Sequence, residues 1–340
     1  MLAPSLSHAQ IGGMKLSILD LAPIVEGATA ADALHNAADL AQHAEGWGYE
    51  RFWLAEHHNM IGIASAATAV CIAHVAGATK TIRVGAGGIM LPNHAPMVIA
   101  EQFGTLESLF PGRIDLGLGR APGTDQRTVR ALRRSLDNAD NFPQDVQEIL
   151  AFFAEAQPGQ VVQAVPGAGL NVPVWILGSS TFGAQVAGLL GLPYAFASHF
   201  APDYLFHAMK AYRERFQPSE YNDKPYAMAG VQAVVADTDR EAQRLFTSMQ
   251  QAFTNMQRNT RGKMQPPIDD IETYWTPAEK AQASRMLTYA FVGSPDTVRA
   301  GLKDFAAKTG VDEIMVAGSV FDHEARLRSY ELLAGIAGEI

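Results

Sequence analysis

Short apolar runs alternate with longer segments along most of the chain. The short runs are rich in Val, Ile, Leu and Trp, which is typical of strands that are buried on both faces. We predict strands at residues 16–21, 51–55, 82–91, 114–119, 174–178, 194–197, 227–236 and 313–317. The longer segments have the length and pattern of helices. We predict these at residues 31–47, 64–78, 97–109, 143–155, 182–190, 203–216 and 239–256, with a last segment at 323–340.

Strands that alternate with helices favour right-handed β-α-β units and therefore a parallel sheet. Eight such units in 340 residues favour closure into a (β/α)8 barrel over an open, doubly wound sheet. An open nucleotide-binding sheet should carry G-x-G-x-x-G after an early strand, and neither residues 85–88 nor 117–119 complete that pattern. The sequence predicts an α/β protein with one TIM-barrel domain, residues 14–340, after a short flexible extension at residues 1–13.

The regular alternation breaks down between Thr238 and Asp312, a stretch too long for one crossover. It contains Pro266-Pro267 and, after the helix at 239–256, a second helical segment at residues 295–309. Long connections in compact domains are usually functional lids or disordered segments. We therefore predict a helical insertion between the seventh and eighth strands that caps the carboxyl ends of the strands.

Composition excludes several classes of function. The chain has 26 Lys and Arg against 35 Asp and Glu, for a formal net charge of −9, and no run of basic residues, which disfavours a nucleic-acid surface. Its single cysteine, Cys71, cannot form an intrachain disulfide and favours a reducing compartment. No segment approaches the roughly 18 apolar residues of a membrane span, and residues 1–13 lack the features of a signal peptide. We expect a cytoplasmic protein that binds neither nucleic acid nor membrane.

Polar residues gather where the predicted strands end, which is where (β/α)8 barrels place their active sites. His57 and His58 follow the second strand, His94 lies beyond the third, Arg120 follows the fourth and His199 follows the sixth. We predict that at least one of these histidines is catalytic; the alternative is that each is an ordinary loop residue. Adjacent residues of an extended chain point to opposite sides. The pair is therefore poorly placed to chelate one ion, and no metal site is predicted.

Arg120 and the loop after the fifth strand predict an anion site. A guanidinium is a rigid fork that matches phosphate, and Gly178-Ser179-Ser180 leads into a helix whose amino end offers hydroxyls and free amides. Because the two segments follow consecutive strands, they can meet at one phosphate. The alternative is that the serines serve only as helix N-caps.

A pair of glycines, Gly87-Gly88, lies near the end of the third strand. Two residues without side chains suit a place where the backbone comes close to a flat ligand, and a simple β-bulge is the alternative. The pair alone does not choose between them.

Taken together, these segments resemble the bacterial luciferase-like monooxygenases, a family of flavin-using (β/α)8 barrels. The resemblance runs from about Leu16 to the C-terminus. It is strongest in Phe52-Trp53-Leu54-Ala55-Glu56-His57-His58, residues 77–85, Leu91-Pro92, residues 111–120 and Val292-Gly293-Ser294-Pro295. Such an ordered set of motifs is specific for the superfamily and much less specific for the reaction.

The resemblance implies roles for the residues after the second strand and in the third. His57 matches the catalytic histidine of the family, which assists the reaction of the reduced flavin with oxygen. Ala86, Gly87 and Gly88 match the segment that contacts the flavin ring. In the family the peptide that corresponds to Gly87-Gly88 is a non-prolyl cis bond.

The resemblance also implies the phosphate site and its limits. Arg120 matches the arginine that holds the FMN phosphate, and Gly178, Ser179 and Ser180 match the phosphate loop after the fifth strand. Gly119 stands where luciferase has a reactive cysteine, and residues 238–312, where the family shapes its substrate pocket, show no similarity apart from residues 292–295. Light emission and a long-chain aldehyde substrate are therefore not implied.

The function implied is that of an FMN-dependent oxidoreductase, a monooxygenase that uses reduced FMN and O2 to oxygenate a small organic substrate. A separate NAD(P)H-dependent flavin reductase would supply the reduced FMN, because the chain has no nicotinamide fingerprint. Two alternatives stay open: hydride transfer with the deazaflavin F420 on the same barrel, and a non-enzymatic flavin-binding protein. The family also implies a homodimer through the helices after the second and third strands. The alanine-rich residues 64–78 are consistent with it, and an internal helix is the alternative for this segment.

Overall fold

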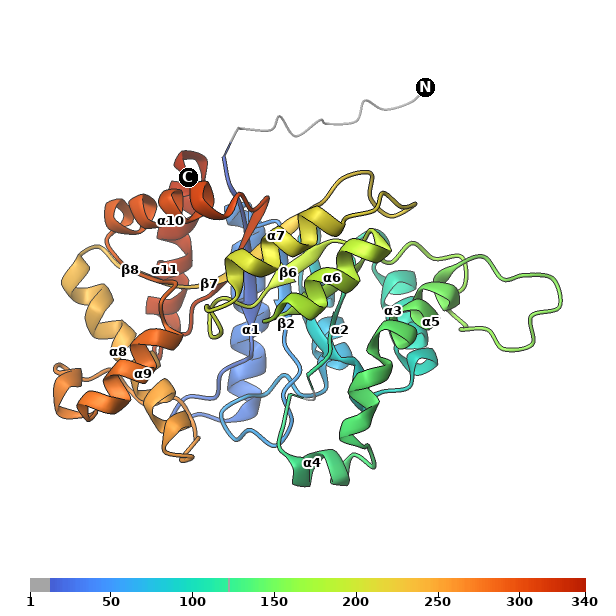
Figure 1. Cartoon of the computed structure of the whole chain (residues 1–340). Coiled ribbons are helices and arrows are strands. Elements are labelled where there is room, and N and C mark those ends of the chain that lie inside the picture. Colours follow the sequence, from blue (N-terminus) through green and yellow to red (C-terminus); the bar gives the residue numbers. More distant parts are fainter. Residues whose placement is uncertain (1–12, 122) are drawn as a thin grey trace.

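A closed parallel barrel surrounded by helices forms the body of the molecule in a computed structural model that describes residues 13–121 and 123–340 (Figure 1). The barrel strands are β1 (Lys15–Asp20), β2 (Arg51–Leu54), β3 (Arg83–Met90), β4 (Ile114–Gly119), β5 (Val174–Gly178), β6 (Tyr194–Phe196), β7 (Ala227–Val235) and β9 (Glu313–Ala317). Neighbouring strands pair in parallel, and β7 closes the ring because it pairs with both β6 and β9. The predicted TIM barrel is confirmed.

Helices follow the strands and cover the outside of the barrel. They are α1 (Ala30–Trp47), α2 (Thr68–Ala78), α3 (Pro96–Leu109), α4 (Gln126–Ala131), α5 (Phe142–Phe153), α6 (Thr181–Leu190), α7 (Leu205–Arg215), α8 (Asp239–Gln257), α9 (Pro277–Met286), α10 (Pro295–Thr309) and α11 (His323–Ile336). Local sequence sets their ends. For example, Thr29 and Asp32 form a capping box at the start of α1, and Gly48 ends it with a left-handed φ of 84°, which glycine adopts at little cost.

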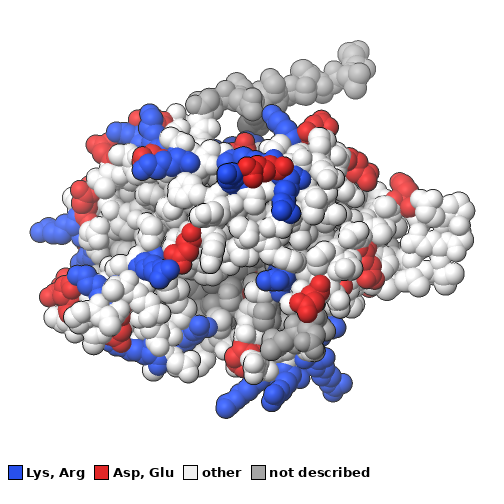
Figure 2. Space-filling view, viewed as in Figure 1, with Lys and Arg blue, Asp and Glu red and all other residues white. Residues whose placement is uncertain are grey.

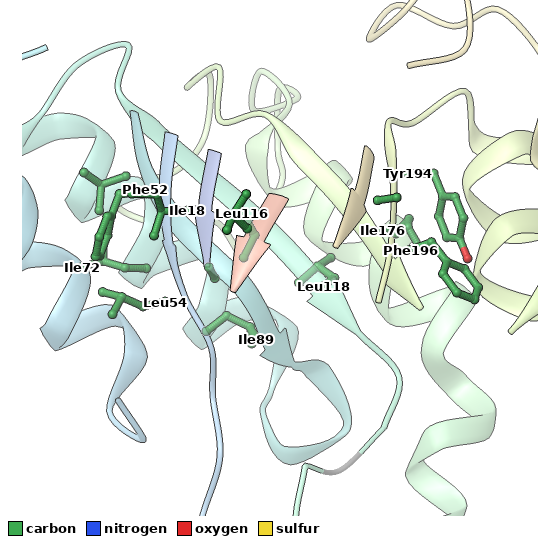
Figure 3. Packing of buried hydrophobic residues seen from close by; sticks show 14 of the residues in the cluster. Ile18, Phe52, Leu54, Ile72, Ile89, Leu116, Leu118, Ile176, Tyr194 and Phe196 are labelled. Atoms are coloured by element: carbon green, nitrogen blue, oxygen red, sulfur yellow. The ribbon is translucent and has the colours of Figure 1, made fainter. Parts of the chain in front are cut away.

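Side chains of the strands alternate between two cores. On β2, Phe52 and Leu54 point outward and pack against helices with Ile72 of α2 (Figure 3). Trp53, between them, points into the barrel and packs with Trp175 of β5. This period of two also decides which way the residues after β2 point.

A buried ion-pair network fills the amino end of the barrel. Arg51 donates from Nε to Glu313 at 2.7 Å and from Nη1 to Asp115 at 2.8 Å. Arg83 donates to the other oxygen of Asp115 at 2.6 Å, and the Ser17 hydroxyl donates to Glu313. The network joins β1, β2, β3, β4 and β9 and closes this end. The opposite end, from Asp20 and Leu54 round to Ala317 together with the loops that follow the strands, is called the barrel mouth below.

The insertion between β7 and β9 is more elaborate than predicted. It contains a helix, α9, and a short strand, β8 (Ala290–Gly293), in addition to α8 and α10, so the prediction of two helical segments was incomplete. Helix α9 begins with a capping box of Thr276 and Glu279, a signal that the sequence carried. Strand β8 pairs with the carboxyl half of β7 outside the closed ring, and its four residues are too few for a period to be read.

One segment of the insertion lies over the loops after β1 and β2, as the predicted cap requires. We call residues 261–264 the strap. Met264 donates its backbone N–H to Ile24 O at 3.0 Å and accepts from Glu26 N at 2.8 Å. The Lys263 ammonium donates to Ala28 O at 2.6 Å. The strap is therefore fixed across the part of the barrel mouth where β1 and β2 end.

The predicted flexible extension, residues 1–13, lies outside the described residues except for Gly13. The described chain begins beside the C-terminus, where Met14 N donates to Ala337 O at 3.2 Å. Cys71 is buried. Helices long and apolar enough to cross a bilayer are absent from residues 13–121 and 123–340.

Candidate active site

The adjacent histidines after β2 point to opposite sides, as the alternation of an extended chain predicts. His58 turns outward, and its Nε2 lies 2.7 Å from Glu56 Oε1. His57 continues the inward row of Arg51 and Trp53, and its Nδ1 is buried without a hydrogen-bond partner in the part of the chain that the structure describes. His57 is therefore the histidine of the pair that faces the barrel mouth.

The surroundings of His57 favour its neutral form. Burial lowers the pKa of the imidazole; the Glu56 carboxylate opposes this, and the Arg261 guanidinium of the strap lowers the pKa further. The ring is therefore neutral at pH 7 and able to accept a proton.

Glu56 is the centre of a hydrogen-bond network behind His57. Besides the contact with His58, its carboxylate lies 2.9 Å from His94 Nε2 and accepts from the backbone N–H of Met90 at 2.9 Å and from Asn93 Nδ2 at 3.3 Å. Burial would raise the pKa of Glu56, but the bonds from His58 and His94 outweigh it and lower the pKa to about 2. The same carboxylate raises the pKa of His58.

This network also contains the one group of possible metal ligands found among the described residues. A carboxylate oxygen of Glu56 and ring nitrogens of His58 and His94 lie within 4.8 Å of one another. Sequence reasoning considered His57 with His58 and missed the pairing of His58 with His94, because loops bring these two together. The hydrogen bonds between the three side chains already account for their arrangement.

The peptide between Gly87 and Gly88 is cis, as the resemblance predicts, and the pairing of β3 with β4 shifts in register there. The protein's own packing requires both glycines. A Cβ on Gly87 would come within 2.6 Å of Leu19 Cδ1, and one on Gly88 within 2.6 Å of Gly117 O. Ala86 is fully buried in the outer core, so its side chain points away from the barrel mouth.

Arg120 and the amino end of α6 lie together, as their consecutive strands predict. The guanidinium carbon of Arg120 is 4.2 Å from the ring centroid of Phe182 in the first turn of α6, and it makes no ion pair with the described residues. Ser180 is the N-cap residue, but its side chain makes no capping bond. The hydroxyls of Ser179 and Ser180, beside Gly178, are thus not used as caps. A free cation, free hydroxyls and the amide groups of a helix amino end fit a phosphate group.

A third polar group lines the mouth on β6 and β7. The His199 ring lies over Gly230, where a Cβ would come within 2.3 Å of His199 Nδ1. Burial lowers the pKa of His199 to about 4. Gln232 donates from Nε2 to His199 O at 3.3 Å, and no described residue donates to its buried Oε1. Sequence reasoning named His199 but missed Gln232, whose only signal was a polar residue in an otherwise apolar strand.

On the face shown in Figure 2, acidic and basic side chains are interspersed around a hollow near the centre, and basic side chains project at the lower edge, where α4 lies. Helix α4 belongs to the loop after β4 and carries Arg127 and Arg130.

A separate groove lies at the amino end of the barrel around Trp47 and Tyr49. None of the predicted site residues lines that groove.

The fold and the site define a (β/α)8-barrel protein in which an arginine beside a helix amino end and a neutral, inward-facing histidine lie at the carboxyl ends of the strands. The chain belongs to the luciferase-like monooxygenase family, whose model matches residues 14–313. It is 54% identical over 325 residues to a luciferase-like monooxygenase of Escherichia coli (strain K12), covering 95% of this chain and 97% of that protein. The crystal structure of apo-MsnO8 matches with a TM-score of 0.88 and 36% identity, covering 95% and 98% of the two chains.

Two more distant structures share the fold. One is the oxygenating constituent of 3,6-diketocamphane monooxygenase from Pseudomonas putida, in complex with FMN, with a TM-score of 0.74 and 17% identity over 96% of this chain and 99% of that one. The other is an F420-dependent secondary alcohol dehydrogenase in complex with an F420-acetone adduct, with a TM-score of 0.70 and 14% identity over the same shares. At these identities the likeness shows the fold alone.

Proposed function

We propose that the protein is an FMN-dependent monooxygenase that uses reduced FMN and O2 to oxygenate a small organic molecule. The observation that carries the proposal is the meeting of Arg120 with the uncapped amino end of α6, on the same barrel mouth as the neutral His57. The family name, and an FMN complex of a monooxygenase with the same fold, support it.

The residues at the mouth fit FMN in distinct ways. Arg120, Ser179 and Ser180 would hold the phosphate through charge-assisted hydrogen bonds. The Gly87-Gly88 segment would support the ring, because it is bare backbone at the edge of the mouth. When bound in its reduced form, the flavin supplies the electrons that activate O2.

The chain's own share of the reaction is positioning and proton management. The neutral His57 imidazole is the group that would exchange a proton with a molecule bound at the mouth. The Glu56 network fixes His58 and the backbone at Met90, and so holds the chain on either side of His57 in place. The strap covers β1 and β2 and would restrict the access of water to this side of the mouth.

The test is a fluorescence titration of the protein with FMN. Arg120→Ala should weaken FMN binding by about ten- to a hundredfold, the equivalent of about 1.5–3 kcal/mol for a charge-assisted contact. Arg127→Ala, on an exposed arginine of α4, is the matched control and should leave the affinity unchanged. Equal affinities of wild type and Arg120→Ala would refute the placement of the phosphate.

A second measurement separates the three candidate functions. Reduced FMN and O2 are added to the protein with a panel of small organic molecules, and oxygen-18 incorporation is followed by mass spectrometry. Labelled product supports the monooxygenase. Binding of F420 without binding of FMN would favour hydride transfer, and tight FMN binding with no product from any panel member would favour a flavin-binding protein.

We propose a separate NAD(P)H-dependent flavin reductase as the source of reduced FMN.

We also propose that the protein forms a homodimer through α2 and α3. Exposed apolar side chains support the dimer: Val70 of α2 is 70% exposed, and Val98 and Leu109 of α3 are 45% and 62% exposed. Burial of such side chains between two copies would favour association. Val70→Lys should shift the mass measured by light scattering from dimer to monomer.

A further inference from the structure

The wall of the barrel mouth opposite the Gly87-Gly88 peptide carries polar atoms that the proposed flavin site does not use. Around the closed ring, β3 reaches β7 through β2, β1 and β9 in one direction and through β4, β5 and β6 in the other. The two strands therefore face each other across the barrel. A flavin held by Gly87-Gly88 on β3 and by Arg120 at the amino end of α6 would lie on the β3–β5 side of the mouth, opposite the wall formed by β6 and β7.

Gln232 is the acceptor on this wall. Its side chain continues the inward row of Met228 and Gly230 on β7 and is only 5% exposed. The hydrogen bond from Nε2 to His199 O, 3.3 Å long, fixes the orientation of the amide and turns Oε1 away from that contact. Oε1 is buried and has no partner among the described residues. A buried carbonyl oxygen is costly to leave unpaired, so this atom points to a ligand that supplies the missing donor.

His199 forms the rest of the wall and holds it in place. Its ring is seated on the bare backbone of Gly230, and the Ser198 hydroxyl donates to Gly230 O at 2.6 Å, which ties the end of β6 to β7. Because burial lowers the pKa of His199 to about 4, the imidazole is neutral at physiological pH. Gln232 and His199 together make an uncharged, polar wall.

We propose that Gln232 and His199 form the substrate-recognition site, and that it takes a small uncharged molecule with an N–H or O–H group that donates to Gln232 Oε1. The proposal rests on the proposed function, which places the flavin against β3. A carbonyl oxygen only accepts hydrogen bonds, so a molecule of the same shape without a donor leaves Oε1 unpaired and is rejected.

The experiment uses two pairs of probes that differ at the donor. The first pair is N-butylacetamide and N-butyl-N-methylacetamide; the second is pentan-1-ol and its isomer butyl methyl ether. Binding of each probe to the FMN-saturated protein is measured by saturation-transfer NMR, with dissociation constants from titration. In the wild type, the donor-bearing member of at least one pair should bind about tenfold or more tightly than its partner. The pair that shows this preference indicates whether the site selects an amide N–H or a hydroxyl O–H donor.

Gln232→Leu removes the acceptor with little change in volume and should bring that ratio close to one, while FMN affinity stays within a few-fold of wild type. Gln42→Leu is the control: Gln42 also donates to a backbone carbonyl, Ala78 O at 2.8 Å, but lies on the outside of the barrel. It should keep the wild-type ratio. If Gln232→Leu does not fold, as judged by circular dichroism, Gln232→Met replaces it.

Several outcomes would overturn the proposal. These are a wild type that shows no preference within either pair or binds none of the four probes, and a preference that survives in Gln232→Leu. Loss of FMN binding in Gln232→Leu would assign Gln232 to the flavin instead and would also overturn it. Failure of the wild type to bind FMN at all is a different result, because it removes the proposed function on which this inference rests.

Discussion

His57 and His58 are neighbours in the chain, but their surroundings predict different consequences of their loss. His57 has an unpaired buried nitrogen at the mouth, whereas His58 is bound to Glu56. His57→Ala should slow single-turnover oxidation of reduced FMN by about 10²–10⁴-fold, the usual effect of losing a general acid–base group, with FMN affinity within a few-fold of wild type. Because burial lowers the pKa of His57, the wild-type rate should hold from pH 8 to neutrality and fall only on the acid side.

His58→Ala is the matched variant, and it should lower the melting temperature more than the chemical step. Stopped-flow absorbance and a thermal melt on both variants make the comparison. If His57→Ala retains wild-type single-turnover kinetics and merely melts earlier, then its imidazole has a structural role.

Glu56 should contribute a pH-dependent part of the stability. Its pKa is about 2 in the folded protein against about 4.3 in an unfolded chain, so the contribution is present above about pH 4.3 and lost as the pH falls toward 2. The raised pKa of His58 adds stability that is present below about pH 6.5 and lost as the pH rises through that raised pKa. Glu56→Gln should therefore lower the free energy of unfolding most between about pH 4.5 and 6.5, by on the order of 2–3 kcal/mol. Urea unfolding at pH 3, 5.5 and 8.5 measures this, and an equal cost at pH 3 and 5.5 would contradict it.

At the scale of elements, the pairing of β3 with β4, which shifts in register after Gly87, depends on close backbone contact. A Cβ on Gly88 would lie 2.6 Å from Gly117 O, and one on Gly117 would lie 2.2 Å from Ala86 O. Backbone atoms cannot move aside without strain. Gly88→Ala and Gly117→Ala should therefore each lower the stability by about 1–3 kcal/mol or more and weaken FMN binding. Gly46→Ala, in α1, meets nothing within 4 Å and should be neutral or stabilising by up to about 1 kcal/mol. Thermal melts of the three variants test this; an undisturbed Gly88→Ala would show that β3 can shift.

Helices and strands were predictable from the sequence where a hydrophobic periodicity or a capping motif marked them. The barrel strands and most of the outer helices follow from apolar runs and helical patterns, while β8 was too short and α9 was overlooked despite the capping box at Thr276. The proximity of Arg120 to the amino end of α6 was predictable because Arg120 and Ser180 follow consecutive strands. The Glu56 network and Gln232 were not, because their partners come from strands and loops whose contacts depend on register and ring closure.

At the scale of the whole molecule, the two ends of the barrel do different work. The amino end is a satisfied network in which Arg51 pairs with Asp115 and Glu313. The carboxyl end holds buried polar atoms of His57, His199 and Gln232 that have no partner within residues 13–121 and 123–340. Hydrogen-bonded polar groups stabilise a fold, whereas buried polar groups without partners are available to ligands. The amino end of the barrel therefore serves stability, and we expect the carboxyl end to serve function.

This separation predicts that a substitution at the amino end of the barrel can lower stability without changing ligand binding at the barrel mouth. Arg51→Met keeps the bulk of the side chain but leaves Glu313 without its guanidinium in the interior, and breaking a buried pair in this way costs about 3–5 kcal/mol. Arg285→Met, in an exposed pair with Asp203, should leave the stability almost unchanged, because exposed ion pairs are screened by solvent. Below its melting temperature, Arg51→Met should bind FMN as the wild type does, because Arg120 and α6 lie at the other end. Urea unfolding and an FMN titration on each variant decide the matter: a loss of FMN affinity in folded Arg51→Met would mean that the network also shapes the mouth.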